Sequence, residues 1–155
     1  MRKTLEFVSL AGLGALAWVT AEALAGSHRL PSRIPTHFDM AGRPNGWGTP
    51  HMLLLLPIVG GAMYLLMTVV SRYPGAFNYP VRVTPANSKR LQELALGMIA
   101  WLKAEVIWLF AAIQIAAVHA ARSGGGGLPA WMMPLVLGVV FGTIIGYVIA
   151  MRRSA

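Results

Sequence analysis

Cysteine and acidic residues are what this sequence has least of. Its 155 residues include no cysteine, and Asp and Glu together number 5. Without cysteine the chain can form neither a disulfide framework nor a thiolate metal site. Charged residues make up 12% of the chain, whereas a soluble domain carries about 25%. Hydrophobic residues reach 56%, so the composition predicts a membrane protein.

The charges that are present are mostly positive. Lys and Arg number 13, which gives a formal net charge of +8. In a soluble protein such an excess would indicate nucleic-acid binding. Here the basic residues flank apolar runs, where they orient helices and meet anionic lipid headgroups. We therefore expect the lipid bilayer, and not nucleic acid, to be the partner of this charge.

Long apolar runs dominate the chain. A helix needs about 20 apolar residues to cross a bilayer, and these runs are long enough to do so. We expect helices at about residues 5–25, 52–70, 85–121 and 129–151. The predicted fold class is all-α, a single integral membrane domain. It is a membrane four-helix bundle with an ordered, Pro/Gly-rich extracytoplasmic loop between the first two helices.

Lys and Arg are shared unequally between the two sides of such a protein. The side with both termini holds eight: Arg2, Lys3, Arg72, Arg82, Lys89, Arg90, Arg152 and Arg153. The other side holds four: Arg29, Arg33, Arg43 and Arg122. This imbalance predicts a multi-pass protein of the bacterial cytoplasmic (plasma) membrane with both termini in the cytoplasm.

The first run also fits a cleaved signal peptide, because Ala23-Leu24-Ala25 precedes Gly26. Its apolar stretch exceeds the roughly 7–15 residues usual in such peptides, which favours an uncleaved helix. In the second run, Pro57 and Gly60-Gly61 predict a kink. Thr84-Pro85 predicts the start of the third helix, with Thr as N-cap and Pro at the first helical position.

Three glycines in the fourth run recur at every fourth position: Gly138, Gly142 and Gly146. A ridge of this kind is a common packing face between membrane helices. One interpretation is that it packs on the third helix of the same chain. The other is that it makes the protein a homo-oligomer.

The stretch from Arg33 to Gly48 is too rich in Pro and Gly for a helix. Pro44-Asn45-Gly46 predicts a tight turn, because Pro presets φ while Asn and Gly tolerate positive φ. Phe38 and Trp47 give the loop apolar side chains to bury. The candidates for binding a ligand or partner are His37, Phe38, Asp39, Arg43 and Trp47. Either these residues only lock the loop onto the bundle, or they form a binding surface.

Four polar side chains fall within the apolar runs or at their edges: Glu22, Lys103, Glu105 and Gln114. Such residues are costly in lipid and often functional. Lys103 lies near a helix end, so we expect it to snorkel to the headgroups. Glu105 is expected to meet a group on another helix or to be protonated. Glu22 is expected to form an ion pair with Arg29, Arg33 or His119.

Signals for catalysis are weak. His28, His37, Asp39 and His51 lie in or beside the first loop, but their spacing specifies no metal site. No nucleophile, base and orienting group can be assembled from the sequence. We therefore expect a non-enzymatic protein with no catalytic residues, no metal and no cofactor.

Two motifs carry a resemblance to a known group. Leu30–Asp39 with Gly42–Gly48, and Phe77–Thr84, resemble segments of a bacterial multi-pass membrane family of unknown function. That family is similar to the N-terminal domain of SdpI-like immunity proteins, which carry more helices. Some relatives protect the cell from a secreted peptide toxin and take part in signalling.

The resemblance implies an immunity-like or sensor-like protein whose outer loop binds a peptide or protein partner. The alternative is a small transporter, or a subunit of one, that uses the intramembrane polar residues.

Overall fold

The protein is a bundle of long helices with a small β-hairpin at one end. The computed structural model describes residues 1–26, 30–124 and 127–154. Its elements in chain order are α1 (Arg2–Ala25), β1 (Ile34–Phe38), β2 (Pro44–Gly48), the 3₁₀ helix η1 (Pro50–Leu54), α2 (Leu55–Val70), the 3₁₀ helix η2 (Pro74–Ala76), α3 (Ser88–Arg122) and α4 (Met132–Arg152). Within the described residues, four helices are long and apolar enough to cross a membrane, with η1 continuing into α2. The predicted all-α membrane bundle is confirmed.

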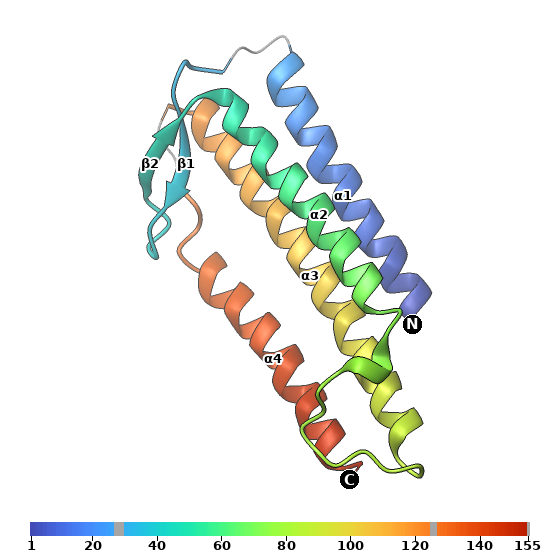
Figure 1. Ribbon diagram of the computed structural model, residues 1–155. Coiled ribbons are helices and arrows are strands. Elements are labelled where there is room, and N and C mark those ends of the chain that lie inside the picture. The colour runs from blue at the N-terminus through green and yellow to red at the C-terminus, as the bar shows by residue number, and fades with distance from the viewer. Residues whose placement is uncertain (27–29, 125–126, 155) are drawn as a thin grey trace.

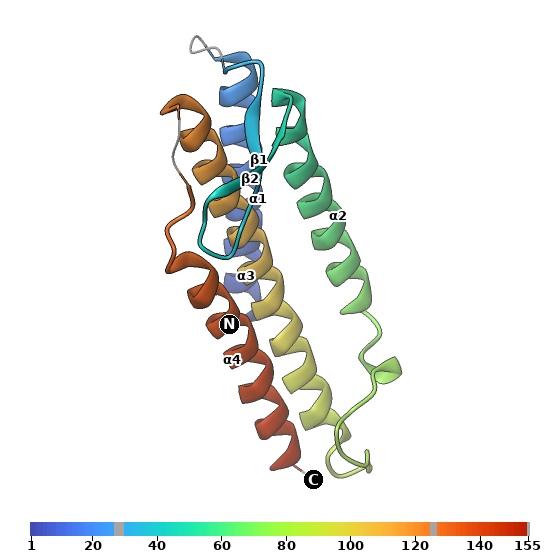
Figure 2. The ribbon, with the colours of Figure 1, turned by 90° about the vertical axis from the view of Figure 1, so that its left-hand side faces the viewer.

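Helix α3 is the axis of the bundle. It packs against each of the other three helices, lying between α2 and α4 with α1 alongside (Figures 1 and 2). Small residues permit the close approach of α1. A Cβ built at Gly12 would lie 2.9 Å from Ile107 Cγ2, and Ala104 and Ala111 are buried in α3. Small residues on α1 and α3 therefore serve packing within the chain.

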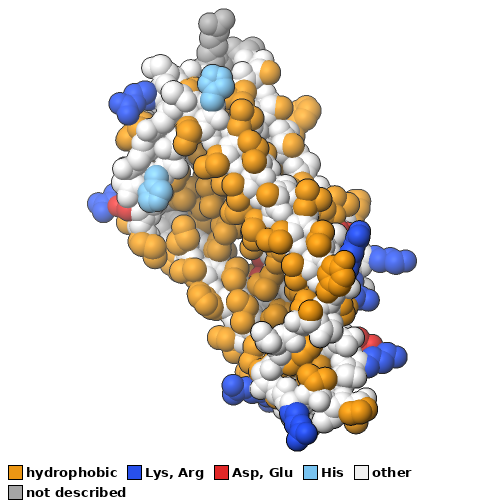
Figure 3. All heavy atoms as spheres, viewed as in Figure 1, with side chains coloured by type: hydrophobic (Ala, Val, Ile, Leu, Met, Phe, Trp, Pro, Cys, Tyr) orange, Lys and Arg blue, Asp and Glu red, His pale blue; other side chains and the backbone are white. Residues whose placement is uncertain are grey.

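The outer surface of the bundle is apolar. Large side chains such as Phe7, Trp18 and Ile58 are more than 60% exposed. Figure 3 shows hydrophobic side chains across the middle of the molecule, with Lys and Arg gathered toward its ends. A surface of this kind is stable when lipid covers it. Together with the lengths of the helices, it makes the chain a multi-pass membrane protein.

The two ends of the bundle differ. We call the end that carries β1 and β2 the hairpin end, and the end that carries Arg2, η2 and Arg152 the terminal end (Figure 1). At the terminal end, the segment after η2 packs back onto the helices, because Phe77 and Tyr79 contact the buried cluster of Leu91 and Met151. The Tyr79 hydroxyl donates to the Pro74 carbonyl at 2.7 Å. Burial raises the pKa of Tyr79.

The start of α3 differs from its prediction. Regular helix begins at Ser88, after a turn at residues 85–87, and not at Pro85. Thr84 still helps to organise the start of the helix. The Asn87 side chain accepts from the Thr84 N–H at 2.8 Å, and the Thr84 hydroxyl accepts from the Asn87 N–H at 3.3 Å. This reciprocal pair satisfies two donors that a helix start leaves free.

The glycine ridge does not pack on α3, which corrects the first interpretation above. Gly138, Gly142 and Gly146 are all exposed, and a Cβ at any of them would meet nothing within 4 Å. Helix α4 instead faces α3 through other side chains, among them Tyr147, whose ring covers Gly97. The three glycines point outward from the bundle. The second interpretation, a homo-oligomer that packs through this ridge, stays a prediction.

Candidate functional site

Polar side chains form a cluster between α1, α2 and α3 toward the terminal end. The Lys103 ammonium donates to Glu6 at 2.6 Å and to the Thr68 hydroxyl at 3.1 Å. It also lies 4.6 Å from the centre of the Tyr64 ring, a cation–π contact. The Tyr64 hydroxyl donates to the other oxygen of Glu6. We call these four residues the Glu6–Lys103 cluster.

This cluster corrects the prediction that Lys103 snorkels. Lys103 is only 4% exposed, and its ammonium stays inside because Glu6 supplies an opposite charge there. Removing a charge from water is tolerated when it is paired and its hydrogen bonds are made. The cluster thus joins three helices through one buried cation.

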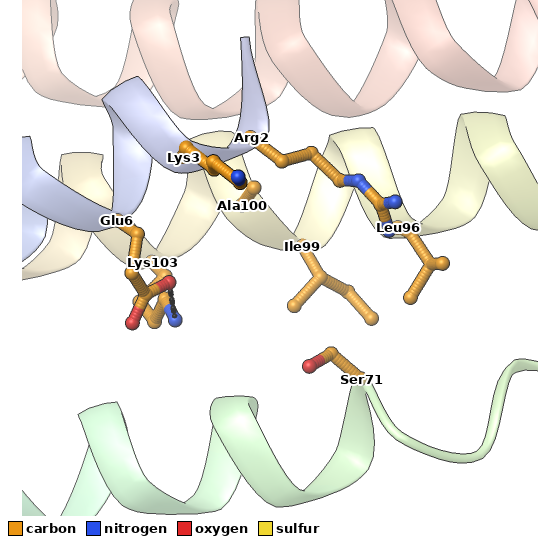
Figure 4. A pocket seen from close by; sticks show the side chains of 8 residues that line it. All are labelled: Arg2, Lys3, Glu6, Ser71, Leu96, Ile99, Ala100 and Lys103. Atoms are coloured by element: carbon orange, nitrogen blue, oxygen red, sulfur yellow. Dashed lines mark hydrogen bonds and ion pairs between the residues drawn. The ribbon is translucent and has the colours of Figure 1, made fainter.

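A cavity of about 310 Å³ adjoins the cluster (Figure 4). Helix α1 contributes Arg2, Lys3 and Glu6 to its wall, and Ser71 comes from the end of α2. Helix α3 contributes Lys103 together with an apolar side: Leu96, Ile99 and Ala100. The wall is therefore cationic on one side and apolar on the other.

Nearer the hairpin end, Gln114 joins the same three helices. It is 1% exposed, and its side-chain amide donates to the Thr20 hydroxyl at 2.7 Å and to the Leu53 carbonyl at 2.8 Å. Leu53 lies in η1, just before α2 begins, and an α-helical bond to its carbonyl would need the N–H of residue 57, which is Pro and has none. Gln114 supplies the missing donor. Pro57 lies in the first turn of α2, close to the point where η1 ends. It therefore does not lie in the middle of a helix, where the predicted kink would have been.

Gln114→Leu is expected to lower the free energy of unfolding by about 1–3 kcal/mol, because it leaves a buried carbonyl without its donor. Adding Pro57→Ala should recover part of this loss, since alanine restores a backbone N–H at that position. The measurement is SDS-induced unfolding in detergent micelles, followed by tryptophan fluorescence. Equal stability of the single and double variants would show that Gln114 does not act through the Leu53 carbonyl.

Glu105 does meet a group on another helix. Its Oε1 accepts from the Thr143 hydroxyl of α4 at 2.6 Å. Its Oε2 is buried and has no hydrogen-bond partner among the described residues. A buried polar atom without a partner is rare and calls for an explanation.

The ion pair of Glu22 forms with a residue other than those predicted. Arg122 at the end of α3 donates to both oxygens of Glu22, at 3.0 and 2.8 Å. Of the predicted partners, Arg29 lies outside the described residues. Both side chains are more than 30% exposed, so the pair fastens the ends of α1 and α3 but contributes little to stability.

The stretch from Arg33 to Gly48 is ordered, as predicted, but its turn lies elsewhere. Pro44–Gly48 forms strand β2, which pairs antiparallel with β1 through Ile34↔Gly48 and Phe38↔Pro44. The reversal occurs at Asp39–Gly42 instead of Pro44-Asn45-Gly46. There Asp39 accepts from the Gly42 N–H, and its own N–H donates to Arg43. Gly42 has φ +77°, which glycine adopts without strain.

Asp39 and Arg43 hold this turn. The Asp39 carboxylate accepts from the backbone N–H groups of Ala41 and Arg43, both at 2.9 Å, and from the Arg43 guanidinium at 3.0 Å. The backbone N–H of Arg43, more than its guanidinium, holds the pKa of Asp39 below its usual value. The charged carboxylate is thus the form that organises the turn.

The hairpin is docked onto the chain that leads into α4. The Leu128 N–H donates to the Gly42 carbonyl at 2.8 Å. A Cβ at Gly42 would overlap the Leu128 carbonyl, and one at Gly127 would overlap the Gly42 carbonyl. On strand β1, Ile34 is fully buried, and Phe38 packs beside it against the Ala117 region of α3. Phe38 therefore locks the hairpin in place.

The opposite face of the hairpin is exposed. Trp47 is 51% exposed and Met40 72% exposed, which corrects the expectation that Trp47 is buried. His37 and Asn45 lie on the same exposed face, joined by a 2.6 Å hydrogen bond. The Arg43 side chain is 79% exposed. Of the five candidates, the structure leaves His37, Arg43 and Trp47 available to a partner.

Sequence reasoning missed Glu6, Tyr64, Thr68 and Thr143. Glu6 carried a usable signal, because it is an acidic residue inside an apolar run, like Glu105. The two threonines and Tyr64 gave none, since membrane helices contain many such residues. In the part of the chain that the structure describes, no three His, Asp or Glu side chains gather as a metal site would require. His28 lies outside that part.

Comparisons with known proteins cover only part of the chain. Residues 12–61 match the model of a domain of unknown function (DUF1648), which spans the hairpin but not Phe77–Thr84. An uncharacterized protein of Archaeoglobus fulgidus is 37% identical over 60 residues, which is 34% of this chain and 33% of that protein. The chain thus covers about a third of the length of this relative. No solved structure matches. The chain is therefore similar, over residues 12–61, to a domain whose function is not known.

Proposed function

We propose that the protein is a non-enzymatic binding protein of the bacterial cytoplasmic membrane, with both termini in the cytoplasm. Its hairpin end binds a peptide or protein partner outside the cell, as an immunity or sensor protein would. The orientation rests on the excess of Lys and Arg at the terminal end. The comparison with a domain of unknown function is compatible with this role and names no ligand.

One observation carries the proposal: the hairpin is held rigidly, yet it presents an exposed tryptophan. Gly42, Ile34 and Phe38 fix it to the bundle. Trp47, His37 and Arg43 stay exposed. Tryptophan and arginine are the residues most often found at the energetic centre of protein interfaces. A surface that is already ordered loses little conformational freedom on binding.

The test is growth of a deletion strain in spent medium from its parent. We expect the deletion strain to be inhibited and the wild-type gene to restore growth. Trp47→Ala should fail to restore growth despite normal membrane expression, because losing such an anchor typically weakens binding by about thirtyfold or more. Trp131→Ala is the matched control, since Trp131 is 64% exposed and lies outside the hairpin. Full protection by Trp47→Ala, or equal growth of both strains, would contradict the proposal.

Transport is the second candidate, and the unpartnered Oε2 of Glu105 favours it. Two observations weigh against transport. Lys103 is paired with Glu6, and Gln114 is hydrogen-bonded to Thr20, so these polar side chains hold the helices together. A Glu105→Gln variant separates the two functions. Loss of the phenotype with normal expression would support transport, and an unchanged phenotype would support binding by the hairpin.

A further inference from the structure

We propose that the cavity beside the Glu6–Lys103 cluster binds a phosphate-bearing anion, either an anionic phospholipid headgroup or a soluble phosphate ester. This site lies at the terminal end and is independent of the hairpin. Its volume of about 310 Å³ is at the lower end of the range for small-ligand sites.

The charge of the cavity wall is the first argument. Three basic side chains, Arg2, Lys3 and Lys103, line it together with a single carboxylate, Glu6. Lys103 and Glu6 neutralise each other at 2.6 Å. Among the described residues, neither Arg2 nor Lys3 takes part in a salt bridge. Two positive charges therefore remain at the wall without a counter-ion from the described residues.

The donors are of the type that phosphate requires. The Arg2 guanidinium can bind two phosphate oxygens at once, and the Lys3 ammonium at the same wall adds further donors. Helix α1 begins at Arg2, so its first backbone N–H groups lack partners within the helix and favour a nearby anion. In Figure 4 the Arg2 side chain extends from α1 over Leu96 of α3, at the edge of the cavity.

The remaining wall fits the apolar part of a lipid. Leu96, Ile99 and Ala100 line the cavity from α3, and the lipid-facing surface of the bundle begins beside them. Ser71 marks the end of α2, where a membrane helix meets the headgroups. A headgroup phosphate at Arg2 and Lys3 would thus leave its acyl chains in the bilayer. A soluble phosphate ester would occupy only the cationic side.

The experiment compares lipid retention by native mass spectrometry after reconstitution into nanodiscs. The discs contain phosphatidylcholine with or without phosphatidylglycerol. The test variant is Arg2→Gln/Lys3→Gln, and the control is Arg152→Gln/Arg153→Gln, which removes equal charge from the same end outside the cavity wall. We expect the wild type and the control to retain phosphatidylglycerol selectively, and the test variant to bind it about tenfold to thirtyfold more weakly. Circular dichroism confirms that both variants fold.

Competition with glycerol phosphate distinguishes the two sources of phosphate. Displacement of the lipid by millimolar glycerol phosphate would assign the site to a soluble phosphate ester, and retention would assign it to a phospholipid headgroup. Equal weakening in both variants would overturn the proposal, because it would show attraction by the general surface charge. Absence of selectivity for phosphatidylglycerol, together with no binding of glycerol phosphate, would also overturn it.

Discussion

Gly42→Ala is expected to lower the free energy of unfolding by roughly 2–3 kcal/mol and to detach the hairpin from the bundle. A side chain at φ +77° costs about 1–2 kcal/mol. The added Cβ would also overlap the Leu128 carbonyl, which breaks a hydrogen bond worth about 1 kcal/mol. The readouts are SDS-induced unfolding in micelles and the rate of limited proteolysis at the hairpin.

The matched control is Gly142→Ala. Gly142 lies in α4 and a Cβ there meets nothing within 4 Å, so this substitution should leave the unfolding free energy unchanged or raise it slightly. A similar stability of the two variants would show that Gly42 and Leu128 do not hold the hairpin in place. The proposed partner binding would then lose its rigid platform, because Trp47 and His37 would sit on a loose loop.

We expect Glu6→Gln to lower the free energy of unfolding by about 2–3 kcal/mol. The substitution leaves the Lys103 ammonium, whose side chain is 5% exposed, without a counter-ion. Breaking a fully buried pair costs about 3–5 kcal/mol. The lower figure applies here because the Glu6 side chain is 39% exposed and water reaches it.

A double-mutant cycle identifies the cause. Adding Lys103→Met to Glu6→Gln removes the unpaired charge, so the double variant should be more stable than the sum of the single effects predicts. Glu22→Gln breaks a pair that is exposed on both sides and should cost no more than about 1 kcal/mol. Additive effects of Glu6 and Lys103 would contradict the coupling seen in the structure.

Much of the architecture was predictable because lipid imposes a simple rule on the sequence. A helix that crosses a bilayer needs about 20 apolar residues, and the four runs satisfy this requirement wherever the helices pack. The boundaries of α1, α2 and α4 accordingly fall within three residues of the predicted ones. The order of the first loop was also predictable, since its Pro, Gly and aromatic residues are typical of a structured turn.

The position of the turn was not predictable from local preferences. Pro44-Asn45-Gly46 is a good turn sequence, yet it forms part of β2, while Asp39–Gly42 makes the reversal. The Asp39 carboxylate collects several donors there, and Gly42 together with Gly127 lets the two segments approach closely. Leu128 is far along the sequence, so no local pattern around Gly42 reveals the contact.

By itself, the sequence determined that this is a membrane protein of four spans with a structured first loop, because hydropathy and turn chemistry are local properties. The tertiary structure decided which polar groups meet. Lys103 pairs with Glu6 on α1, and Gln114 donates to the Leu53 carbonyl of η1. It also decided that the glycine ridge of α4 faces outward, away from α3. These outcomes depend on how each helix rotates against α3, and a helical period states only which residues share a face.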